Sequence, residues 1–301
     1  MEKMNLFVGL DVHSKTTTGT IKDSEGNPIR VLQVETNQEG FKKLFAGFSK
    51  KQLIVVFEAT RNWHYYAELI EPYCSKLVMA HPLKVRAIAS ARIKTDAIDS
   101  NILCDLLRAN LIPESFMAPL DVVEFRELLR YRARLSRDCG RLKTRAKNIL
   151  SREGKTCEFD EVTGKRARLW LNNLLLNKLN REQLDYTVKL IDTYNMELKK
   201  IDACLEQEQY KYPKIELLKT IPGIGTYSAL LIMMEIADFA RFPTPDKLAA
   251  YAGLVPSTYQ SSQVQYNGRI TKQGNRMLRW ILTQSAHASV KSRKTHKLKT
   301  F

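Results

Sequence analysis

The chain has 301 residues, of which 48 are Lys or Arg and 32 are Asp or Glu, so its formal net charge is +16. Hydrophobic residues make up 44% of the sequence, enough for two folded domains with cores of their own. The positive excess indicates a polyanionic partner, and nucleic acid is the one we expect.

Cysteine spacing and apolar runs exclude further classes of protein. The five cysteines are odd in number, widely spaced and outside any CxxC or Cys/His cluster, so neither a zinc site nor a disulfide framework is expected. The N-terminus lacks a signal-peptide pattern, and the longest apolar stretch, near ALLIMMEIA, is too short for a bilayer. We expect a cytoplasmic protein without a membrane partner.

The first third of the chain alternates between strand and helix patterns. The runs NLFVGLDV, TTTGTIKD and IRVLQVE predict three antiparallel strands, and NQEGFKKLFAGF predicts a helix. A buried strand (LIVVFEA), a helix (HYYAELIEPYC) and a short strand (KLVMA) follow. This order predicts a mixed α/β sheet of the size of an RNase H-like domain, over residues 1–118.

Four carboxylates in this part predict a divalent-metal site. Asp11 and Glu58 end apolar runs, while Asp96 and Asp99 are spaced to share one helix face. In an RNase H-like sheet they would meet and could hold two Mg²⁺ or Mn²⁺ ions about 4 Å apart. Each carboxylate alone could be a surface ion pair or, for Asp96, a helix cap. His13 could contact a phosphate, in a supporting role.

Residues 119–212 predict two long helices. Leucine and isoleucine recur every seven residues, which favours a helical hairpin or a coiled-coil dimerisation arm. The period leaves open whether the partner helix belongs to the same chain. The repeating positions are Leu128, Leu135, Leu142 and Ile149 in the first helix, and Leu184, Ile191, Leu198 and Leu205 in the second.

The first long helix is strongly basic, with ten Lys or Arg side chains between Arg126 and Arg152 against Glu127 and Asp138. A solvated face would normally mix signs, so we expect contact with a phosphate backbone, without base recognition. The predicted contact residues are Arg126, Arg130, Arg134, Arg137, Arg141 and Arg145.

The last part of the chain, residues 213–301, contains two further phosphate-binding candidates. Gly223 and Gly225 in the IPGIG turn precede an apolar helix, as in a helix-hairpin-helix element, although the turn could be an ordinary tight connection. The run GRITKQGNRMLRW predicts a basic turn entering a helix. Its candidate contacts are Arg269, Lys272, Arg276 and Arg279.

Several ordered motifs resemble a known family. GLDVHSK, FEAT, KTDAIDS, IPGIGTYSA, AGLVPSTYQSS and GRITKQGNRMLRW resemble the DEDD insertion-sequence transposases of the "one-hundred-ten" family, with Piv-like DNA invertases as relatives. The resemblance implies a RuvC-like N-terminal domain, a coiled-coil arm and a mainly α-helical C-terminal transposase domain. It implies that Asp11, Glu58, Asp96 and Asp99 are metal ligands.

The resemblance also implies a serine nucleophile, which the residues alone do not show because no His-Asp pattern accompanies it. Its place after the GLVP motif points to Ser261, with Ser262 as the alternative, since SSQVQYNG lacks the glycines that often follow this serine. The implied site joins carboxylates and serine of different subunits in a homodimer or tetramer. A structured noncoding guide RNA and DNA are the implied partners, in a prokaryotic nucleoid.

We therefore expect a DNA transposase or recombinase of an insertion sequence. A Holliday-junction-type nuclease that uses water and a catalytically inactive nucleic-acid-binding derivative are the alternatives. Because the sequence ends at KTHKLKTF, where family members continue, a short copy is also expected. An actin-like kinase is disfavoured by the charge and by the absence of glycine-rich phosphate loops.

Overall fold

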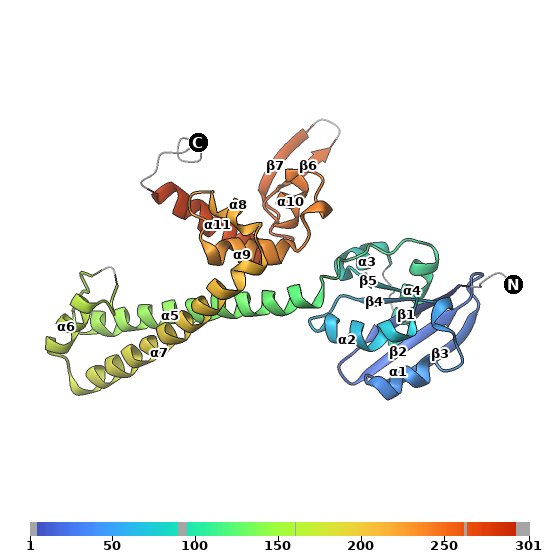
Figure 1. Ribbon diagram of the computed structural model, residues 1–301, viewed down its shortest axis with the longest axis horizontal. Coiled ribbons are helices and arrows are strands. Elements are labelled where there is room, and N and C mark those ends of the chain that lie inside the picture. Colours follow the sequence, from blue (N-terminus) through green and yellow to red (C-terminus); the bar gives the residue numbers. More distant parts are fainter. Residues whose placement is uncertain (1–4, 90–94, 160, 262–263, 293–301) are drawn as a thin grey trace. The chain divides into compact units, whose positions relative to one another are not determined.

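Two compact units, Met1–Ala118 and Pro119–Phe301, make up the computed structural model. The structure describes residues 5–89, 95–159, 161–261 and 264–292 (Figure 1). The first unit holds the predicted α/β sheet. The second holds the two long helices and the C-terminal part of the chain.

The first unit is built on a five-stranded mixed sheet with the order β3-β2-β1-β4-β5. Strands β1, β2 and β3 are antiparallel neighbours, whereas β4 and β5 run parallel to β1. The mixed sheet confirms the α/β prediction and is consistent with an RNase H-like domain. The strands are β1 (Leu6–Val12), β2 (Thr16–Lys22), β3 (Pro28–Glu35), β4 (Leu53–Glu58) and β5 (Lys76–Ala80).

Helices cover both faces of this sheet. On one face, Phe41 of α1 and Ile70 of α2 pack with Val8 of β1. On the other face, Leu103 of α4 packs with Val56 of β4. The alternation of side chains along each strand explains this division, because neighbouring residues point to opposite faces. The helices are α1 (Gln38–Leu44), α2 (Trp63–Ile70), α3 (Pro82–Ile88) and α4 (Asp96–Arg108), with short 3₁₀ turns η1 (Lys50–Gln52) and η2 (Glu71–Tyr73).

The second unit begins with a helical hairpin. Helix α5 (Leu120–Arg152) packs along α7 (Lys178–Glu208), and the short α6 (Lys165–Asn173) closes the end of the hairpin (Figure 1). Ala146 and Ile149 of α5 share an apolar cluster with Leu184 of α7. The partner of each long helix therefore lies in the same chain, as one of the two predicted alternatives required.

A compact helical bundle follows the hairpin. Its central helix α9 is apolar on nearly all sides and packs against α5, α7, α8 and α11. The two-stranded sheet of β6 and β7 stands between α10 and α11 in the chain. The elements are η3 (Gln209–Lys211), α8 (Ile215–Lys219), α9 (Thr226–Ile236), η4 (Phe239–Arg241), α10 (Pro245–Tyr251), β6 (Pro256–Ser261), β7 (Val264–Ile270) and α11 (Arg276–Lys291).

A buried carboxylate ties this bundle to the hairpin. Glu235 of α9 is completely buried. Arg130 of α5 donates to both of its oxygens at 2.7 and 2.8 Å, and Asn275 donates to one of them at 2.7 Å. A carboxylate without water needs such partners, because its desolvation is otherwise unfavourable. Glu235 and its two partners, Arg130 and Asn275, therefore join α9 to α5 and to the start of α11.

Among the described residues, no helix is both long enough and apolar enough to cross a membrane.

Candidate metal site and nucleic-acid surfaces

Asp11 and Glu58 lie at the carboxyl ends of neighbouring parallel strands. Leu10 of β1 is in register with Phe57 of β4, so the two acidic residues that follow stand side by side along the sheet edge. Asp11 shares the face of Gly9, and Glu58 shares the face of Val56, which packs against α4. Both strand ends therefore present a carboxylate on the face that α4 covers.

Gly9 allows α4 to approach this face closely. A Cβ at residue 9 would lie 2.0 Å from the Ser100 carbonyl oxygen and 2.5 Å from the Cys104 amide nitrogen. Two side-chain hydrogen bonds fix the helix there: Ser100 Oγ to Thr20 Oγ1 at 2.8 Å and Cys104 Sγ to the Phe7 carbonyl at 3.1 Å. The close packing brings the start of α4 to the end of β1.

Thr95 starts α4 at this point. Its hydroxyl oxygen accepts a hydrogen bond from the Ile98 amide at 3.3 Å, as an N-cap residue does. Asp96 and Asp99 occupy the first turn, where the helix dipole favours negative charge. Both predicted carboxylates of α4 therefore belong to the helix end nearest the strand ends.

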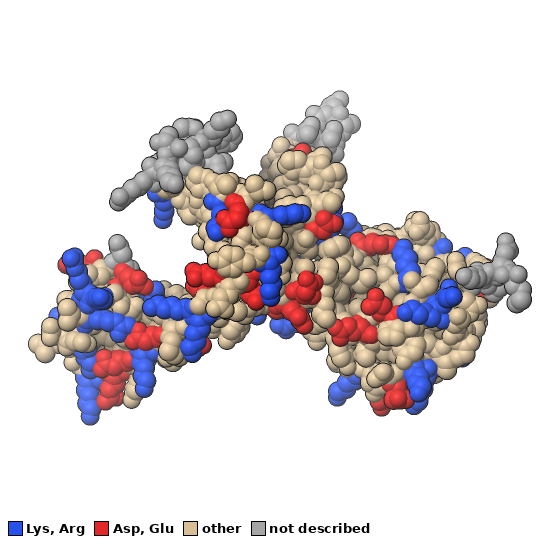
Figure 2. Space-filling model, in the orientation of Figure 1, with Lys and Arg blue, Asp and Glu red and all other residues tan. Residues whose placement is uncertain are grey.

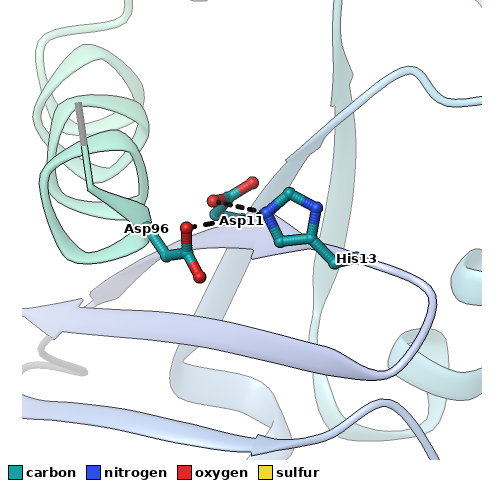
Figure 3. Close-up of side chains that lie close together, drawn as sticks. All are labelled: Asp11, His13 and Asp96. Carbon is teal, nitrogen blue, oxygen red and sulfur yellow. Dashed lines mark ion pairs between the residues drawn. The ribbon is translucent and has the colours of Figure 1, made fainter.

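Three side chains form a cluster that could hold a cation: Asp11, His13 and Asp96 (Figure 3). One ligand atom from each lies within 4.8 Å of the others. His13 Nε2 is 3.2 Å from Asp11 Oδ2 and 3.7 Å from Asp96 Oδ1. The ring comes from the turn after β1 and reaches back over the strand end toward both carboxylates.

The cluster differs in membership from the predicted set of four carboxylates. Glu58 and Asp99 are outside the group of three, whereas His13, which the sequence suggested only as a supporting residue, is inside it. Asp99 is still close enough to act on Asp11 electrostatically. The feature of the sequence that could have identified His13 is its position two residues after Asp11, near the end of β1.

The surroundings of Asp11 oppose its ionisation. Burial raises the pKa of the Asp11 carboxyl above its ordinary value, and the charges of Asp96 and Asp99 raise this pKa further, whereas His13 lowers it. Repelling carboxylates in a half-buried place favour a cation among them. Carboxylate oxygens suit Mg²⁺ and Mn²⁺, so the donors present fit a divalent metal ion, with Asp11 and Asp96 as the residues that would hold it.

The basic helix α5 divides into internal and exposed arginines. Arg126 donates to the Met234 carbonyl at 2.8 and 3.0 Å, Arg130 binds Glu235, and Arg132 pairs with Asp202 at 2.9 Å. Two of the six predicted nucleic-acid contacts, Arg126 and Arg130, are thus engaged within the fold. We call the remaining four the arginine stripe, because their spacing of three or four residues places them on one helix face: Arg134, Arg137, Arg141 and Arg145.

The arginine stripe is exposed along its whole length. Two members have acidic neighbours, Glu127 at 3.7 Å from Arg134 and Asp138 at 3.0 Å from Arg141. In the face shown in Figure 2, Lys and Arg side chains gather over the closed end of the hairpin, with fewer Asp and Glu among them. Exposed ion pairs of this kind are weak and would exchange readily for phosphates.

The predicted glycines lie in the turn before α9. Gly223 has a φ of 89°, and a Cβ there would lie 2.4 Å from the Ser285 carbonyl oxygen of α11. Close packing on α11 is therefore a sufficient reason for glycine at this position. Gly225 is the N-cap residue of α9, and a Cβ there would meet open space.

The basic turn before α11 and the first turn of α11 also mix internal and exposed side chains. Arg279 donates to the Ala252 carbonyl at 2.8 Å and so braces the turn after α10. Arg269, Lys272 and Arg276 are exposed. These three side chains remain available for phosphate contact.

Ser261 is the last residue of β6, and its backbone pairs with Val264 of β7. The alternative serine, Ser262, lies outside the described residues. Ser257, on the same strand, donates to the Arg269 carbonyl at 3.2 Å and has a structural role in the hairpin.

Together, the five-stranded mixed sheet and the carboxylates at its edge define an α/β domain, consistent with an RNase H-like fold, that carries a candidate divalent-metal site. Comparison with known families assigns two parts of the chain to families of transposases. Residues 8–153 match a transposase family of the DEDD type. Residues 215–301 match the family described as Transposase IS116/IS110/IS902. The chain therefore belongs to the IS110 family of transposases.

Individual relatives agree with this membership. The chain is 26% identical to the pilin gene-inverting protein of Moraxella lacunata over 292 residues, 93% of this chain and 81% of that protein. It is 32% identical to the transposase of insertion sequence element IS1111A of Coxiella burnetii over 123 residues, 41% of this chain and 30% of that protein. A Sinorhizobium fredii protein named "Putative transposase y4pF/y4sB" is 25% identical over 250 residues, and the match spans 77% of this chain and 60% of that protein.

Proposed function

We propose that this chain is a DNA transposase or recombinase of an insertion sequence, in which a metal-binding carboxylate site and a serine nucleophile cut and rejoin DNA. The observation that carries the proposal is the approach of Asp96 and His13 to Asp11 at the sheet edge, in a chain whose family is that of transposases. Mg²⁺ or Mn²⁺ is the proposed cofactor. Glu58 and Asp99, which flank the cluster, are the further proposed ligands.

The metal and the serine have separate roles in the proposed reaction. When bound, the metal would supply positive charge to stabilise the phosphoryl oxygens in the transition state. Ser261 Oγ attacks the phosphorus of one DNA strand and loses its proton. The Oγ–P bond forms, and the bond from phosphorus to a deoxyribose oxygen breaks as that oxygen takes up a proton. The covalent protein–DNA link conserves the free energy of the broken phosphodiester bond, which is then available for rejoining DNA strands.

The nucleic acid would lie along basic surfaces of the second unit. The arginine stripe on α5 and the exposed Arg269, Lys272 and Arg276 present cations without fixed internal partners of the kind that hold Arg130. Phosphate contacts of this type position nucleic acid without reading its sequence. Base pairing by a structured guide RNA would then supply the sequence specificity.

The proposed site is shared between subunits. Carboxylates of one chain would meet Ser261 of another, so the active form is a homodimer or tetramer. The exposed location of the cluster, with His13 56% and Asp96 44% exposed, leaves room for DNA and a second subunit.

Covalent trapping tests the serine. Purified protein with its copurified RNA is incubated with Mg²⁺ and labelled DNA of the element's end, and the products are separated under denaturing conditions. A labelled protein band is expected for the native chain and for Ser257→Ala, and its loss is expected for Ser261→Ala. A band that survives Ser261→Ala and disappears in Ser262→Ala would move the nucleophile to the neighbouring residue. Cleavage without any band would indicate water as the nucleophile.

Ribonuclease treatment tests the guide RNA. RNA should copurify with the chain, and the chain should protect a defined fragment of that RNA from the ribonuclease. Complete removal of the RNA should stop sequence-specific cleavage while leaving salt-sensitive DNA binding. Cleavage at the same position after complete removal of RNA would contradict the RNA guide. That result would leave the transposase assignment in place.

A further inference from the structure

We propose that His13 is itself a metal ligand, and that its imidazole gives the site a mixed oxygen and nitrogen donor set that favours Mn²⁺ over Mg²⁺. This inference rests on the metal site of the proposed function and adds a ligand of a different chemical type to the predicted carboxylates. Its evidence is the position of the ring, the way the backbone holds it and the atoms it faces.

The separations between donor atoms suit ligands of one ion. Metal–ligand distances of about 2.1 Å in an octahedral site place neighbouring ligand atoms about 3 Å apart and opposite ones about 4.2 Å apart. His13 Nε2 lies 3.2 Å from Asp11 Oδ2 and 3.7 Å from Asp96 Oδ1. The three donors could therefore converge on one cation through small side-chain movements.

The backbone of His13 is held from both sides. Its amide donates to the Thr16 carbonyl at 2.9 Å, which closes the turn between β1 and β2. Its carbonyl accepts from Thr36 Oγ1 at 2.8 Å, and that hydroxyl is bonded in turn to the buried Thr17 Oγ1 at 2.8 Å. A ligand held on such a turn is preorganised for binding.

Asp96 is also oriented by a neighbour. Gln33 of β3 lies 3.4 Å from Asp96 Oδ2 and 3.4 Å from Thr18 Oγ1. The other oxygen, Oδ1, is the one directed toward His13 (Figure 3). Contacts of this kind to the outer oxygen are typical of ligating carboxylates.

A simple ion pair accounts for the arrangement of these three side chains less well than a shared cation does. The ring uses one atom, Nε2, toward oxygens of two different carboxylates, and this nitrogen can carry only one proton or one metal ion. His13 is 56% exposed, and exposed ion pairs contribute at most about 1 kcal/mol. A shared cation satisfies all three groups at once.

The donor set has a consequence for metal choice. Mg²⁺ prefers oxygen ligands and water, whereas imidazole binds transition-metal ions more readily. Removal of the ring should therefore weaken Mn²⁺ binding more than Mg²⁺ binding. Loss of a ligand contact of this kind lowers metal affinity by roughly tenfold or more.

Pulsed electron paramagnetic resonance of Mn²⁺ bound to the full chain tests the proposal directly. Electron spin echo modulation from imidazole ¹⁴N reports a nitrogen bonded to the metal, independently of any DNA chemistry. His13→Ala and His13→Asn are compared with the native chain. His287→Ala, which removes an exposed histidine of α11 in the other unit, is the matched control.

We expect ¹⁴N modulation in the native chain and in His287→Ala and its loss in both His13 variants. We also expect the Mn²⁺ affinity to fall by about tenfold or more in His13→Asn, with a smaller fall in the Mg²⁺ affinity. Bound Mn²⁺ without ¹⁴N modulation in the native chain, or modulation that persists in both His13 variants, would overturn the role of His13 and leave the carboxylate site intact. Absence of saturable Mn²⁺ binding to the native chain would contradict this inference and the proposed metal site together.

Discussion

Gly9 of β1 lies directly beneath the Ser100 carbonyl of α4, so that a methyl group on residue 9 would be 2.0 Å from that oxygen. This relationship determines where the first turn of α4 meets the end of β1. The cluster of Asp11, His13 and Asp96 depends on it, because Asp96 begins the helix and Asp11 follows Gly9 by two residues.

Gly9→Ala should move α4 away from the sheet and separate Asp96 from Asp11. Overpacking of this kind costs about 1–3 kcal/mol of unfolding free energy, and Mn²⁺ affinity should fall with it. Urea unfolding and Mn²⁺ titration measure the two effects. Gly140→Ala is the control, since a Cβ in this part of α5 meets open space and should stabilise the helix by about 0.5–1 kcal/mol. Equal stability and metal affinity in Gly9→Ala and the native chain would show that α4 does not need this close approach.

Arg130→Ala should strongly destabilise the second unit. The substitution leaves the carboxylate of Glu235 buried without its main partner, which costs about 3–5 kcal/mol. Arg137→Ala, on the exposed arginine stripe of the same helix, should change the free energy of unfolding by less than about 0.5 kcal/mol. Chemical denaturation of the full chain compares the two, and similar losses of stability would argue against Glu235 as the junction of α5, α9 and α11.

The arginine stripe should govern the salt dependence of nucleic-acid binding. Replacing Arg137, Arg141 and Arg145 together by alanine removes three candidate phosphate contacts. The slope of log affinity against log salt concentration should become shallower by about 2 to 3. Lys189→Ala with Lys199→Ala, on exposed positions of α7, is the control and should leave the slope nearly unchanged. An unchanged slope in the triple variant would place the nucleic acid on another surface.

The cysteines should differ sharply in reactivity. Burial raises the pKa of the Cys74 and Cys104 thiols to about 11, whereas Cys204 is exposed. At pH 8 a thiol reagent should modify Cys204 first and reach the two buried thiols only after unfolding. Mass spectrometry of partially labelled protein gives the order, and early labelling of Cys104 would contradict its packing against β1.

The same thiols make a contribution to the pH dependence of stability. In the unfolded chain they ionise near their ordinary pKa of 9.0, but in the folded chain they remain neutral until about 11. The folded state therefore binds more protons between these values, and stability should fall as pH rises from about 9 to about 11. Cys74→Ala with Cys104→Ala should flatten this part of the stability curve. A curve of unchanged steepness would assign the loss to other groups.

The local sequence pattern was sufficient to predict many of the strands and helices of the first unit. The strands end close to where the apolar runs end, so Asp11 and Glu58 were identifiable from the sequence. The spacing of Asp96 and Asp99 predicted one helix face, and the structure places both in the first turn of α4, with Thr95 rather than Asp96 as the cap. The role of His13 depends on the path of the turn after β1, which the residues alone do not specify. Its entry into the cluster is a tertiary effect.

The second unit shows the limits of periodicity and charge. The predicted seam included Leu128, whereas Leu129 is the completely buried neighbour, because α5 packs against both α7 and α9. The basic pattern of α5 grouped Arg130 with the exposed arginines, although its partner, Glu235, is 105 residues away in sequence. A single acidic residue within the apolar run ALLIMMEIA was the available signal, since a buried carboxylate requires a cationic partner.

Metal-dependent cleavage of DNA by carboxylate variants tests the central claim most directly. Labelled DNA of the element's end is incubated with the purified protein at a series of Mg²⁺ and Mn²⁺ concentrations. The native chain and Glu68→Gln, an exposed carboxylate of α2, should cut the DNA, whereas Asp11→Asn and Asp96→Asn should reduce cutting by more than about a hundredfold while remaining folded. Undiminished cleavage by folded Asp11→Asn and Asp96→Asn would contradict the assignment of this cluster as the catalytic metal site.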